Sequence, residues 1–557
     1  MKWSTACTDW EQRLIDKKSI IPPPIFKDQA DHALSIFKEL KVVDLPGKPT
    51  FGECSEQWVF NFVSAIFGAY DAETGRQYIR EFYLLISKKN TKSTIAAGIM
   101  LTAVILCWRE NEEHLILAPT KEVADNSYRP AAGMVRADEE LDALFHVQDH
   151  LRAITHRVTK ASLKVVAADT DTVSGKKAGR ILVDEHWLFG RRHNAESMFL
   201  EATGGQVARS EGWVIYLTTQ SDDPPAGVFR EKLNYFRDVR DGVIDDPKSL
   251  GILYEFPKDM IEKKDYLKEE NFYITNPNID RSVSSEWLVD NLKKQTAKTD
   301  GSYQQFLAKH LNIEIGLNLR ANRWTGVDFW EKQSNGVTLN EILDKSEVVV
   351  IGIDGGGLDD MLGLAVIGRD SENHLLWRLW NRAWLHPIAL ERRKAEAPRY
   401  NDFVSDGDLI IVEEVGQDVE QVCEVVRQCE EAGLLDRIGV DPSGIGDIVD
   451  AIVDMDIEHD RVVGISQGWR LNGAIKTTER RLAGDSKGRM IHGGQPIMSW
   501  CASNAMVEPK GNAILVTKQA SGTGKIDPLM ATFCAVALMA MNPEARSETI
   551  QQGFISL

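Results

Sequence analysis

The 557-residue sequence lacks any uninterrupted apolar run near the roughly 18 residues that span a bilayer. It also lacks paired cysteines, because its seven cysteines are scattered, form no CxxC pair and are odd in number. Charged residues such as Asp9 and Lys17 interrupt the N-terminus, which therefore does not have the layout of a secretory signal. These absences exclude a membrane protein and predict a cytoplasmic protein with reduced, mostly buried thiols.

The sequence also lacks an excess of positive charge, since its formal net charge is −18 at pH 7. Neutralisation of phosphates by Lys and Arg is the usual source of sequence-independent DNA affinity, so any DNA contact must be local. Short basic clusters are candidates for such contacts, although clusters of this kind are most often solvated surface. The clusters are Lys176/Lys177, Arg191/Arg192, Arg392/Arg393/Lys394 and Arg480/Arg481.

The chain is long enough for about three or four structural units at roughly 150 residues per domain. Residues 1–50 contain few periodic segments and indicate an N-terminal arm or a small helical lead-in, whereas helices and short apolar strands alternate over 51–225, as in an α/β sheet. Residues 226–340 are polar, charged and mostly helical with no new buried strand, which favours a lid or linker. A second α/β unit is predicted over 341–541, followed by a polar tail at 542–557.

The predicted elements follow from apolar runs and their periodicity. In the first α/β unit the strands are expected at 82–86, 115–118, 163–168, 181–183 and 213–217, with a helix at 93–108. In the second unit the strands are expected at 348–353, 362–367, 375–379 and 438–440, with a helix from 528 to about 541.

The strand at 82–86 runs into Ser-Lys-Lys-Asn-Thr-Lys-Ser-Thr at 87–94 and then a helix, the arrangement of a phosphate-binding loop. Lys92 would reach the β- and γ-phosphates of ATP, and the Ser93 hydroxyl would ligate Mg²⁺. Backbone amides at the helix start would face the phosphates, so Asn90, Thr91 and Thr94 belong to the same candidate site.

Both glycines of the usual phosphate-binding loop are missing, because Ile86 and Thr91 stand in their places. Glycine normally lets the backbone and the phosphate approach closely. An exposed basic turn between a strand and a helix therefore remains an alternative for this segment.

Two further strands end in polar residues that suit a nucleotide site. The strand at 181–183 ends in Asp184, which would hold Mg²⁺ through water, and Glu185, which would orient the attacking water. The strand at 213–217 is followed by Thr218-Thr219-Gln220, where Thr219 would sense the γ-phosphate. Strand ends with acids or turn formers are common, but the three segments follow the order of an additional-strand P-loop ATPase.

Three aspartates in the second unit form a candidate metal site. Asp354 and Asp441 each follow a strand, and Asp527 precedes Pro528 and a helix. Taken singly they fit a hairpin turn, a strand-to-helix turn and a helix N-cap. Converging at one sheet edge, they would bind two divalent metals about 4 Å apart for phosphodiester cleavage, and oxygen ligands favour Mg²⁺ or Mn²⁺ over zinc. Asp359 and Asp360 are second-rank candidates.

The ordered set of these segments resembles the large terminase subunit of tailed double-stranded DNA phages, and the resemblance covers nearly the whole chain. The segments that carry it are Glu56-Gln57-Trp58, Ser87 to Thr94, Ala118-Pro119-Thr120, Ile181 to Glu185, Thr218 to Gln220, Ile353-Asp354, Val440-Asp441, His492-Gly493-Gly494-Gln495-Pro496 and Lys525-Ile526-Asp527-Pro528.

The resemblance implies a P-loop ATPase domain followed by a ribonuclease H-like nuclease domain. It implies that Gln57 lies near the adenine and that Lys88 or Lys89 acts as a basic finger, which would stabilise charge developing on the γ-phosphoryl group. Ordinary surface charge is the alternative for both lysines, and the sequence does not choose between them.

The resemblance also implies a motor that hydrolyses ATP to translocate double-stranded DNA into a procapsid and cleaves concatemeric DNA. Its expected partners are the portal protein, a small terminase subunit and further copies of itself in a ring. It would work in the host cytoplasm, transiently on the procapsid portal. A ring eases the charge problem, because basic patches can line its channel while its outer faces stay acidic.

Two other hypotheses remain open at this point. In the first, the degenerate loop binds nucleotide without hydrolysing it, and the first half of the chain is a docking platform for a nuclease. In the second, the acidic pair Asp184-Glu185 belongs to a helicase or DNA-repair enzyme. The absence of a second recognisable helicase domain, with a carboxylate triad in its place, weighs against the second hypothesis.

Overall fold

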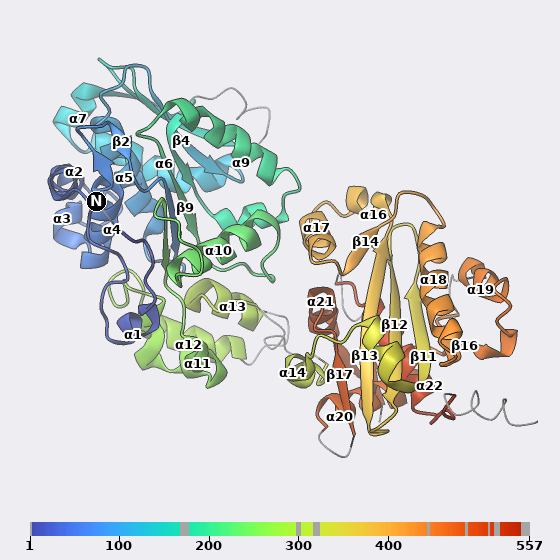
Figure 1. Cartoon of the computed structure of the whole chain (residues 1–557). Helices are drawn as coiled ribbons and strands as arrows, with labels where there is room; N and C mark the ends of the chain where they lie inside the picture. The colour runs from blue at the N-terminus through green and yellow to red at the C-terminus, as the bar shows by residue number, and fades with distance from the viewer. Residues whose placement is uncertain are drawn as a thin grey trace, which may run out of the picture. The chain divides into compact units, whose positions relative to one another are not determined.

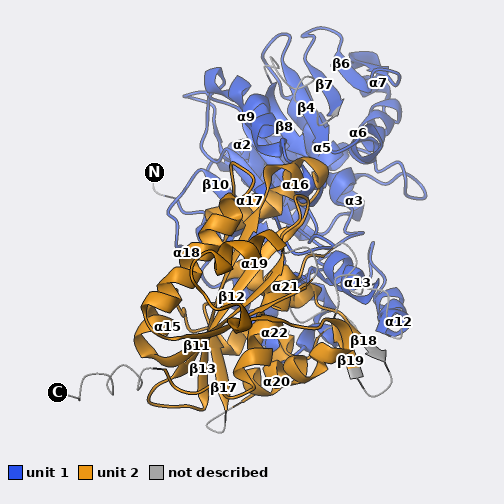
Figure 2. Cartoon of the chain, turned by 90° about the vertical axis from the view of Figure 1, so that its right-hand side faces the viewer, with its two compact units in different colours: residues 1–315 blue, residues 316–557 orange. Residues whose placement is uncertain are grey.

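The structure, a computed structural model, describes residues 3–167, 178–296, 302–315, 324–442, 446–484, 488–510, 513–516 and 524–546. The basic pair Lys176/Lys177 and the predicted tail beyond residue 546 lie outside these ranges. The chain divides into two compact units, residues 1–315 and 316–557 (Figures 1 and 2). Within the described ranges no helix is both long and apolar enough to cross a membrane.

Unit 1 is built on an eight-stranded sheet of order β10-β3-β9-β8-β4-β7-β6-β5. The strands are β3 (Glu81–Leu85), β4 (Glu113–Ala118), β5 (Phe145–Gln148), β6 (Ala153–His156), β7 (Ser162–Ala167), β8 (Ala178–Val183), β9 (Trp213–Thr218) and β10 (Ser249–Leu253). From β10 to β7 they run parallel, while β6 and β5 are antiparallel to their neighbours. The strands predicted over 51–225 are therefore confirmed, as is the helix at 93–108.

Helices cover both faces of this sheet. On one face α5 (Lys92–Ile105) and α6 (Lys121–Arg136) pack together, with α2 (Lys27–Glu39) and α4 (Gln57–Phe67) beside them. On the other, η1 (His186–Arg191), α9 (Ala195–Gly204) and α10 (Gly227–Arg240) pack on buried strand residues. The remaining helices are α1 (Trp10–Ile15), α3 (Phe51–Cys54), α7 (Glu139–Leu144), η2 (Gly205–Ala208), α11 (Lys258–Glu262), η3 (Asp265–Leu267), η4 (Glu269–Ile274), α12 (Ser285–Thr296) and α13 (Ser302–Leu311); a separate hairpin is formed by β1 (Tyr70–Asp71) and β2 (Arg76–Gln77).

The prediction that 226–340 holds no buried strand is wrong at β10. This strand is buried along its whole length and pairs in parallel with β3. Its run of five residues includes Gly251, where a Cβ would lie 3.0 Å from the carbonyl oxygen of Phe236 in α10. A glycine in so short a run hides the strand signal in the sequence, while in the fold it lets α10 approach the sheet closely.

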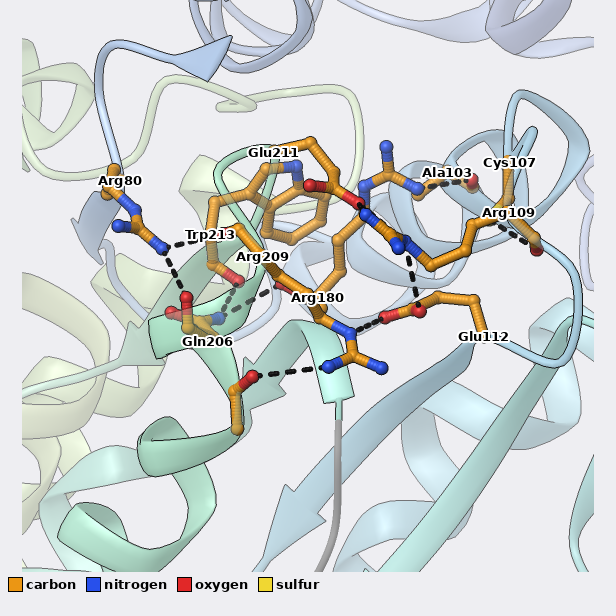
Figure 3. Close-up of polar contacts among 12 residues, drawn as sticks. Arg80, Ala103, Cys107, Arg109, Glu112, Arg180, Gln206, Arg209, Glu211 and Trp213 are labelled. Carbon is orange, nitrogen blue, oxygen red and sulfur yellow. Dashed lines mark hydrogen bonds and ion pairs between the residues drawn. The ribbon is translucent and has the colours of Figure 1, made fainter. Parts of the chain in front are cut away.

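A polar network closes the amino-terminal edge of this sheet (Figure 3). Arg109 donates to Glu211 with Nη2 and Oε1 2.6 Å apart, and Arg209 donates to Glu112 with Nε and Oε1 2.6 Å apart. Gln206 donates to backbone carbonyls of β8 and β9 in the same network (Figure 3). Both glutamates are buried, so the guanidinium groups offset the cost of burying their charge. The opposite edge, at the carboxyl ends of the strands, is where sheets of this kind bind ligands.

Unit 2 is built on a mixed sheet of order β14-β13-β12-β11-β15-β16, with β17 also paired to β13. The strands are β11 (Ser346–Gly355), β12 (Met361–Asp370), β13 (Leu376–Leu385), β14 (Leu409–Ile411), β15 (Leu435–Val440), β16 (Val462–Gly464) and β17 (Arg489–His492); β18 (Val507–Lys510) and β19 (Ala513–Val516) form a separate hairpin. β11, β12 and β13 form an antiparallel meander, which confirms the predicted pairing of 348–353 with 362–367. The other strands of the sheet run parallel to their neighbours.

Helices again cover both faces. α14 (Val327–Trp330), α17 (Ala397–Ser405), α20 (Asn472–Leu482), α21 (Pro496–Asn504) and α22 (Asp527–Met539) contribute to one core. α15 (Leu339–Lys345), α18 (Gln417–Glu431) and α19 (Gly446–Val453) contribute to the core on the other face. The remaining short helices are α16 (Pro387–Arg392), η5 (Glu331–Gln333), η6 (His459–Arg461) and η7 (Gly468–Leu471).

α22 lies directly on the sheet because glycines take the place of side chains beneath it. A Cβ on Gly352 of β11 would lie 2.0 Å from the carbonyl oxygen of Ala531, and one on Gly363 of β12 would lie 2.6 Å from the Cα of Pro528. The helix begins at Asp527 with Ile526 as its N-cap, so the alternative interpretation of Asp527 as the N-cap is wrong by one residue. The close approach sets the position of Asp527 against the sheet.

We expect Gly352→Ala to lower the free energy of unfolding by at least about 1–3 kcal/mol, the usual cost of overpacking, because the clashing atom belongs to the backbone. Differential scanning calorimetry of the full-length protein measures the change. Gly473→Ala in α20 is the matched control, since no atom lies within 4 Å of its added Cβ. Equal transition temperatures for the two variants would contradict the close packing of α22 on the sheet.

Candidate active sites

The loop between β3 and α5 takes on backbone conformations that glycine usually supplies. Lys89 and Thr91 have positive φ angles of 75° and 57°. A non-glycine residue in this left-handed region costs roughly 1–2 kcal/mol. Thr91, where the expected glycine is missing, therefore holds the glycine conformation at a cost that its surroundings must offset.

Asparagine side chains from outside the loop brace it. Asn90 is fully buried, and its Nδ2 donates to Asn276 Oδ1 at 2.9 Å. The backbone N–H of Asn278 donates to Asn90 Oδ1 at 3.0 Å, and its Nδ2 donates to Thr91 Oγ1 at 3.1 Å. Trp58 in turn donates to Asn278 Oδ1 at 2.7 Å. Sequence reasoning missed Asn276 and Asn278, because asparagines beside Pro277 read only as turn formers.

The predicted phosphate and metal residues meet at the carboxyl ends of β3 and β8. Ser93 Oγ donates to Asp184 Oδ2 at 3.2 Å, and Ser127 Oγ donates to the same oxygen at 2.8 Å. Asp184 is fully buried, and burial followed by the neighbouring Glu185 charge raises its pKa. The hydroxyl of Ser93 and the carboxylate of Asp184 therefore form an adjacent pair of oxygen atoms suited to ligating a metal ion.

Lys92 and Glu185 form an ion pair with Nζ and Oε1 2.6 Å apart, in which the Glu185 side chain is 19% exposed. Burial by itself raises the pKa of Glu185, but the Lys92 ammonium, the hydrogen bond from Trp187 and the charge of Lys309 together lower it. Lys92 is only 7% exposed, so its charge requires this partner or an equivalent anion.

The other residues predicted for the nucleotide site, Lys88, Lys89 and Gln57, lie at exposed positions. Lys88 and Lys89 are both exposed on the loop, which leaves either of them available as a basic finger. Gln57 is exposed and donates to Asn61 at 2.9 Å. A cavity of about 180 Å³ beside the loop is lined by Thr91 and Thr94 but not by Gln57; its other lining residues include Phe51, Glu56, Val59, Ile95 and Arg281.

The end of β9 connects to the acidic pair through a tryptophan. Thr218 Oγ1 accepts from the backbone N–H of Trp187 at 3.1 Å, and Trp187 Nε1 donates to Glu185 Oε2 at 2.5 Å. The predicted sensor Thr219 is buried and donates to the carbonyl of Gln220 at 3.1 Å. Lys309 of α13 also donates to that carbonyl, at 2.7 Å, and no sequence motif pointed to it.

Asp354 and Asp441 stand at equivalent positions on two neighbouring parallel strands. Ile353 of β11 pairs with Val440 of β15, and the backbone N–H of Asp441 donates to the carbonyl of Ile353 at 3.2 Å. Asp354 is 1% exposed. Burial, followed by the charges of Asp354 and Asp441, raises the pKa of the Cys534 thiol in α22, which places both carboxylates within electrostatic reach of that helix.

Asp527 approaches Asp354 from the helix above the sheet. It is fully buried, and its backbone carbon lies 2.7 Å from the position of a Cβ on Gly363, the β12 residue paired with Asp354. Its Oδ1 lies 3.3 Å from the position of a Cβ on Gly355. The structure therefore brings all three aspartates to one sheet edge. Within the described ranges, however, no three acidic, histidine or cysteine side chains form a ready-made metal cluster.

The second-rank candidates carry ion pairs of their own. Asp359 lies 3.3 Å from Arg392 in α16, and Asp360 pairs with Lys525 next to the start of α22. Arg392 thus contacts the loop between β11 and β12, whereas Arg191 pairs with Asp222 and Asp223.

Residues 57–237 match the family described as terminase large subunit, ATPase domain, and residues 251–543 match terminase large subunit, endonuclease domain. The chain is 23% identical over 505 residues to the terminase large subunit of Enterobacteria phage HK97, covering 88% of this chain and 90% of that protein. It is 22% identical to protein YmfN of Escherichia coli (strain K12), covering 64% of this chain and 76% of that protein.

Similar solved structures include the HK97 bacteriophage large terminase (19% identity, TM-score 0.46, covering 92% of this chain and 99% of that one). The large terminase from a thermophilic bacteriophage in complex with ATP-γ-S has 12% identity and a TM-score of 0.30, covering 82% of this chain and 93% of that one. The bacteriophage SPP1 large terminase nuclease domain with bound Mn has 13% identity and a TM-score of 0.23, covering 37% and 94%. The two family matches extend over most of the sequence and confirm the resemblance: the chain belongs to the terminase large subunit family, with an ATPase domain followed by an endonuclease domain.

Proposed function

We propose that Lys92, Ser93, Asp184 and Glu185 form the ATPase site of a motor that moves double-stranded DNA into a procapsid. We propose further that Asp354, Asp441 and Asp527 form the nuclease site that cleaves concatemeric DNA. The observation that carries the proposal is the pairing of Lys92 with Glu185 and of Ser93 with Asp184 at the carboxyl ends of β3 and β8. A lysine, a hydroxyl and two acids in this arrangement are the groups that phosphoryl transfer requires.

Lys92 changes partner during the ATPase cycle. Without nucleotide it neutralises Glu185; when ATP binds, its ammonium turns to the β- and γ-phosphates, and backbone amides of 90–94 face the same anion. Ser93 and Asp184 supply adjacent oxygens that suit Mg²⁺, which when bound neutralises charge on the β- and γ-phosphates. Asn90, Thr91 and Thr94 shape the loop around the phosphates.

Glu185 becomes available to orient the attacking water once Lys92 has left it. Its second oxygen remains held by Trp187, so the carboxylate stays in place. Lys88 or Lys89 approaches the γ-phosphoryl as the basic finger, and Thr219 responds to its loss. Gln57 would reach the adenine only after leaving Asn61.

In the nuclease site, all three candidate ligands offer carboxylate oxygens, a donor set that suits Mg²⁺ with Mn²⁺ as a substitute. Two such ions, when bound, activate water and stabilise the leaving oxygen of the phosphodiester. Asp354 and Asp441 are held in place by adjacent strands, and Asp527 is held by the close packing of α22 on the sheet. The endonuclease family match over residues 251–543 includes all three aspartates, which supports this choice.

The partners follow from this role. They are double-stranded DNA, the portal protein, a small terminase subunit and further copies of this chain in a ring, in the host cytoplasm and transiently on the procapsid portal. Basic groups such as Arg392, which pairs with Asp359 in the loop after β11, would contact DNA phosphates locally, as the acidic net charge requires.

Lys92→Ala is expected to abolish ATP hydrolysis and leave DNA cleavage intact, because it removes the phosphate-binding cation without touching the nuclease domain. Steady-state phosphate release and plasmid cleavage with Mg²⁺ or Mn²⁺ measure the two activities separately. Lys263→Ala, at a lysine whose side chain is 68% exposed, is the matched control. Unchanged ATP turnover in Lys92→Ala would contradict the loop assignment.

Asp441→Asn should show the reverse pattern, with DNA cleavage lost and ATP hydrolysis retained. The amide keeps the size of the side chain but removes the charge that a divalent cation needs. Asp454→Asn at an exposed position on the same unit serves as control. Plasmid cleavage at the normal rate by Asp441→Asn would overturn the metal site.

The ion pair between Lys92 and Glu185 should be measurable in the protein without nucleotide. Glu185→Gln leaves the buried Lys92 without its partner, and Lys92→Met does the same to the partly buried Glu185, so we expect a double-mutant cycle to give a coupling energy of about 1–3 kcal/mol. Chemical denaturation of the wild type, both single variants and the double variant provides the four values. Strictly additive effects would mean that the two side chains do not interact in solution.

A further inference from the structure

Glu185, the carboxylate proposed to orient water, has a neighbour, Lys309, that belongs to none of the sequence motifs. Lys309 of α13 places its Nζ 3.0 Å from the centroid of the Trp187 ring. The indole of Trp187 donates to Glu185 Oε2, so Lys309 and Glu185 are joined through a single side chain. A cation over an indole face is attracted by the ring and withdraws electron density from it, which strengthens the indole N–H as a donor.

Lys309 also lies among the charges of the nucleotide site. Burial lowers its pKa to about 7; Asp222 and Glu185 act in the opposite direction, while Lys92 and Lys88 lower it further. Its ammonium is therefore close enough to the proposed phosphate-binding and water-orienting groups to respond to their charge. An incoming anion that draws Lys92 away from Glu185 changes the field at Lys309 at the same time.

The end of α13 is bonded to both other parts of the site. The carbonyl of Lys309 accepts from the backbone N–H of Lys88 in the loop at 2.7 Å. Its Nζ donates to the carbonyl of Gln220 after β9, and Asn312 Oδ1 accepts from the backbone N–H of Gln220 at 3.3 Å. The buried side-chain amide of Gln220 itself has no hydrogen-bond partner among the described residues. A movement of α13 is thereby transmitted to the loop, to the end of β9 and to Trp187.

We propose that Lys309 is a positioning residue for ATP hydrolysis, which holds Glu185 in its working orientation through Trp187 and ties the position of α13 to that orientation. The inference rests on the proposed role of Glu185 and goes beyond it. Once Lys92 has turned to the phosphates, Trp187 is the described side chain that still holds Glu185, and the Lys309 ammonium fixes the ring of Trp187. A purely structural lysine would stabilise α13 without affecting the turnover of bound ATP.

The test compares Lys309→Met, Lys309→Arg and Trp187→Phe in the full-length protein. Lys309→Met removes the charge but keeps a long apolar side chain, and we expect kcat for ATP to fall about tenfold to a hundredfold with little change in KM, as for a misplaced catalytic group. Trp187→Phe removes the indole donor but keeps an aromatic ring, and it should give a similar fall in kcat. The double variant should be no worse than either single variant, because both break the same connection.

The pH profile separates positioning from packing. The wild-type Lys309 is charged below a pH of about 7 and loses its charge above it, so its contribution to kcat should decline as the pH rises through that value. The charged and titratable groups around it are Lys88, Lys92, Glu185, Arg191, Asp222 and His310. Burial lowers the pKa of His310 to about 4, so His310 stays neutral across this range. Lys309→Arg should keep kcat and move this decline of kcat to higher pH.

Lys294→Met, at an exposed lysine of the neighbouring α12, is the matched control. An unchanged kcat in Lys309→Met, or a Lys309→Arg profile identical to that of the wild type, would overturn the proposal. If Lys309→Met does not fold, the profile of Lys309→Arg still decides the matter. Failure of the proposed ATPase site looks different, since Lys92→Ala would then keep its turnover whatever Lys309→Met does.

Discussion

The proposed ATPase site depends on the burial of the Lys92 ammonium. A cation that is only 7% exposed must have an anion beside it, and Glu185 is that anion in the protein without nucleotide. In the proposed assignment the same requirement makes the site responsive to ATP, because the phosphates would replace Glu185 as the anion beside Lys92. Under the proposed function, electroneutrality would link the binding of the nucleotide to the release of the carboxylate that orients water.

In the nuclease unit, the position of the candidate site residues depends on close packing and not on charge. Its aspartates stand at the ends of neighbouring strands, but the third comes from a helix that must approach the sheet unusually closely. Gly352 and Gly363 make that approach possible, since any side chain there would strike the backbone of α22. Two features that look unrelated in the sequence, small residues inside apolar strands and a late acidic helix start, therefore serve one purpose.

The sequence predicts the residues at strand ends well and the contacts between distant segments poorly. Lys92, Asp184, Asp354 and Asp441 were found because a buried strand followed by a charged residue is a local pattern. β10 was missed because Gly251 weakens a five-residue run, and its place beside β3 is a tertiary fact. Lys309 looks like any other lysine near a helix end, and only the fold brings it to Trp187. The roles assigned to these site residues remain predictions.

The contrast between local sequence and contacts from distant segments also explains how the phosphate-binding loop can lack its usual glycines. A loop that relies on its own sequence needs glycine where φ is positive, because other residues are strained there. Here Thr91 holds that conformation while Asn278 donates to its hydroxyl and the buried side chain of Asn90 is bonded on both sides. The shape of the loop is thus supported from the segment that follows η4 and not from its own sequence. A loop supported from outside can lose its glycines and keep its geometry, so a weak local motif is compatible with a well-formed site. The same support makes the loop sensitive to the position of that segment, which precedes α12 and α13 in the chain, and α13 carries Lys309.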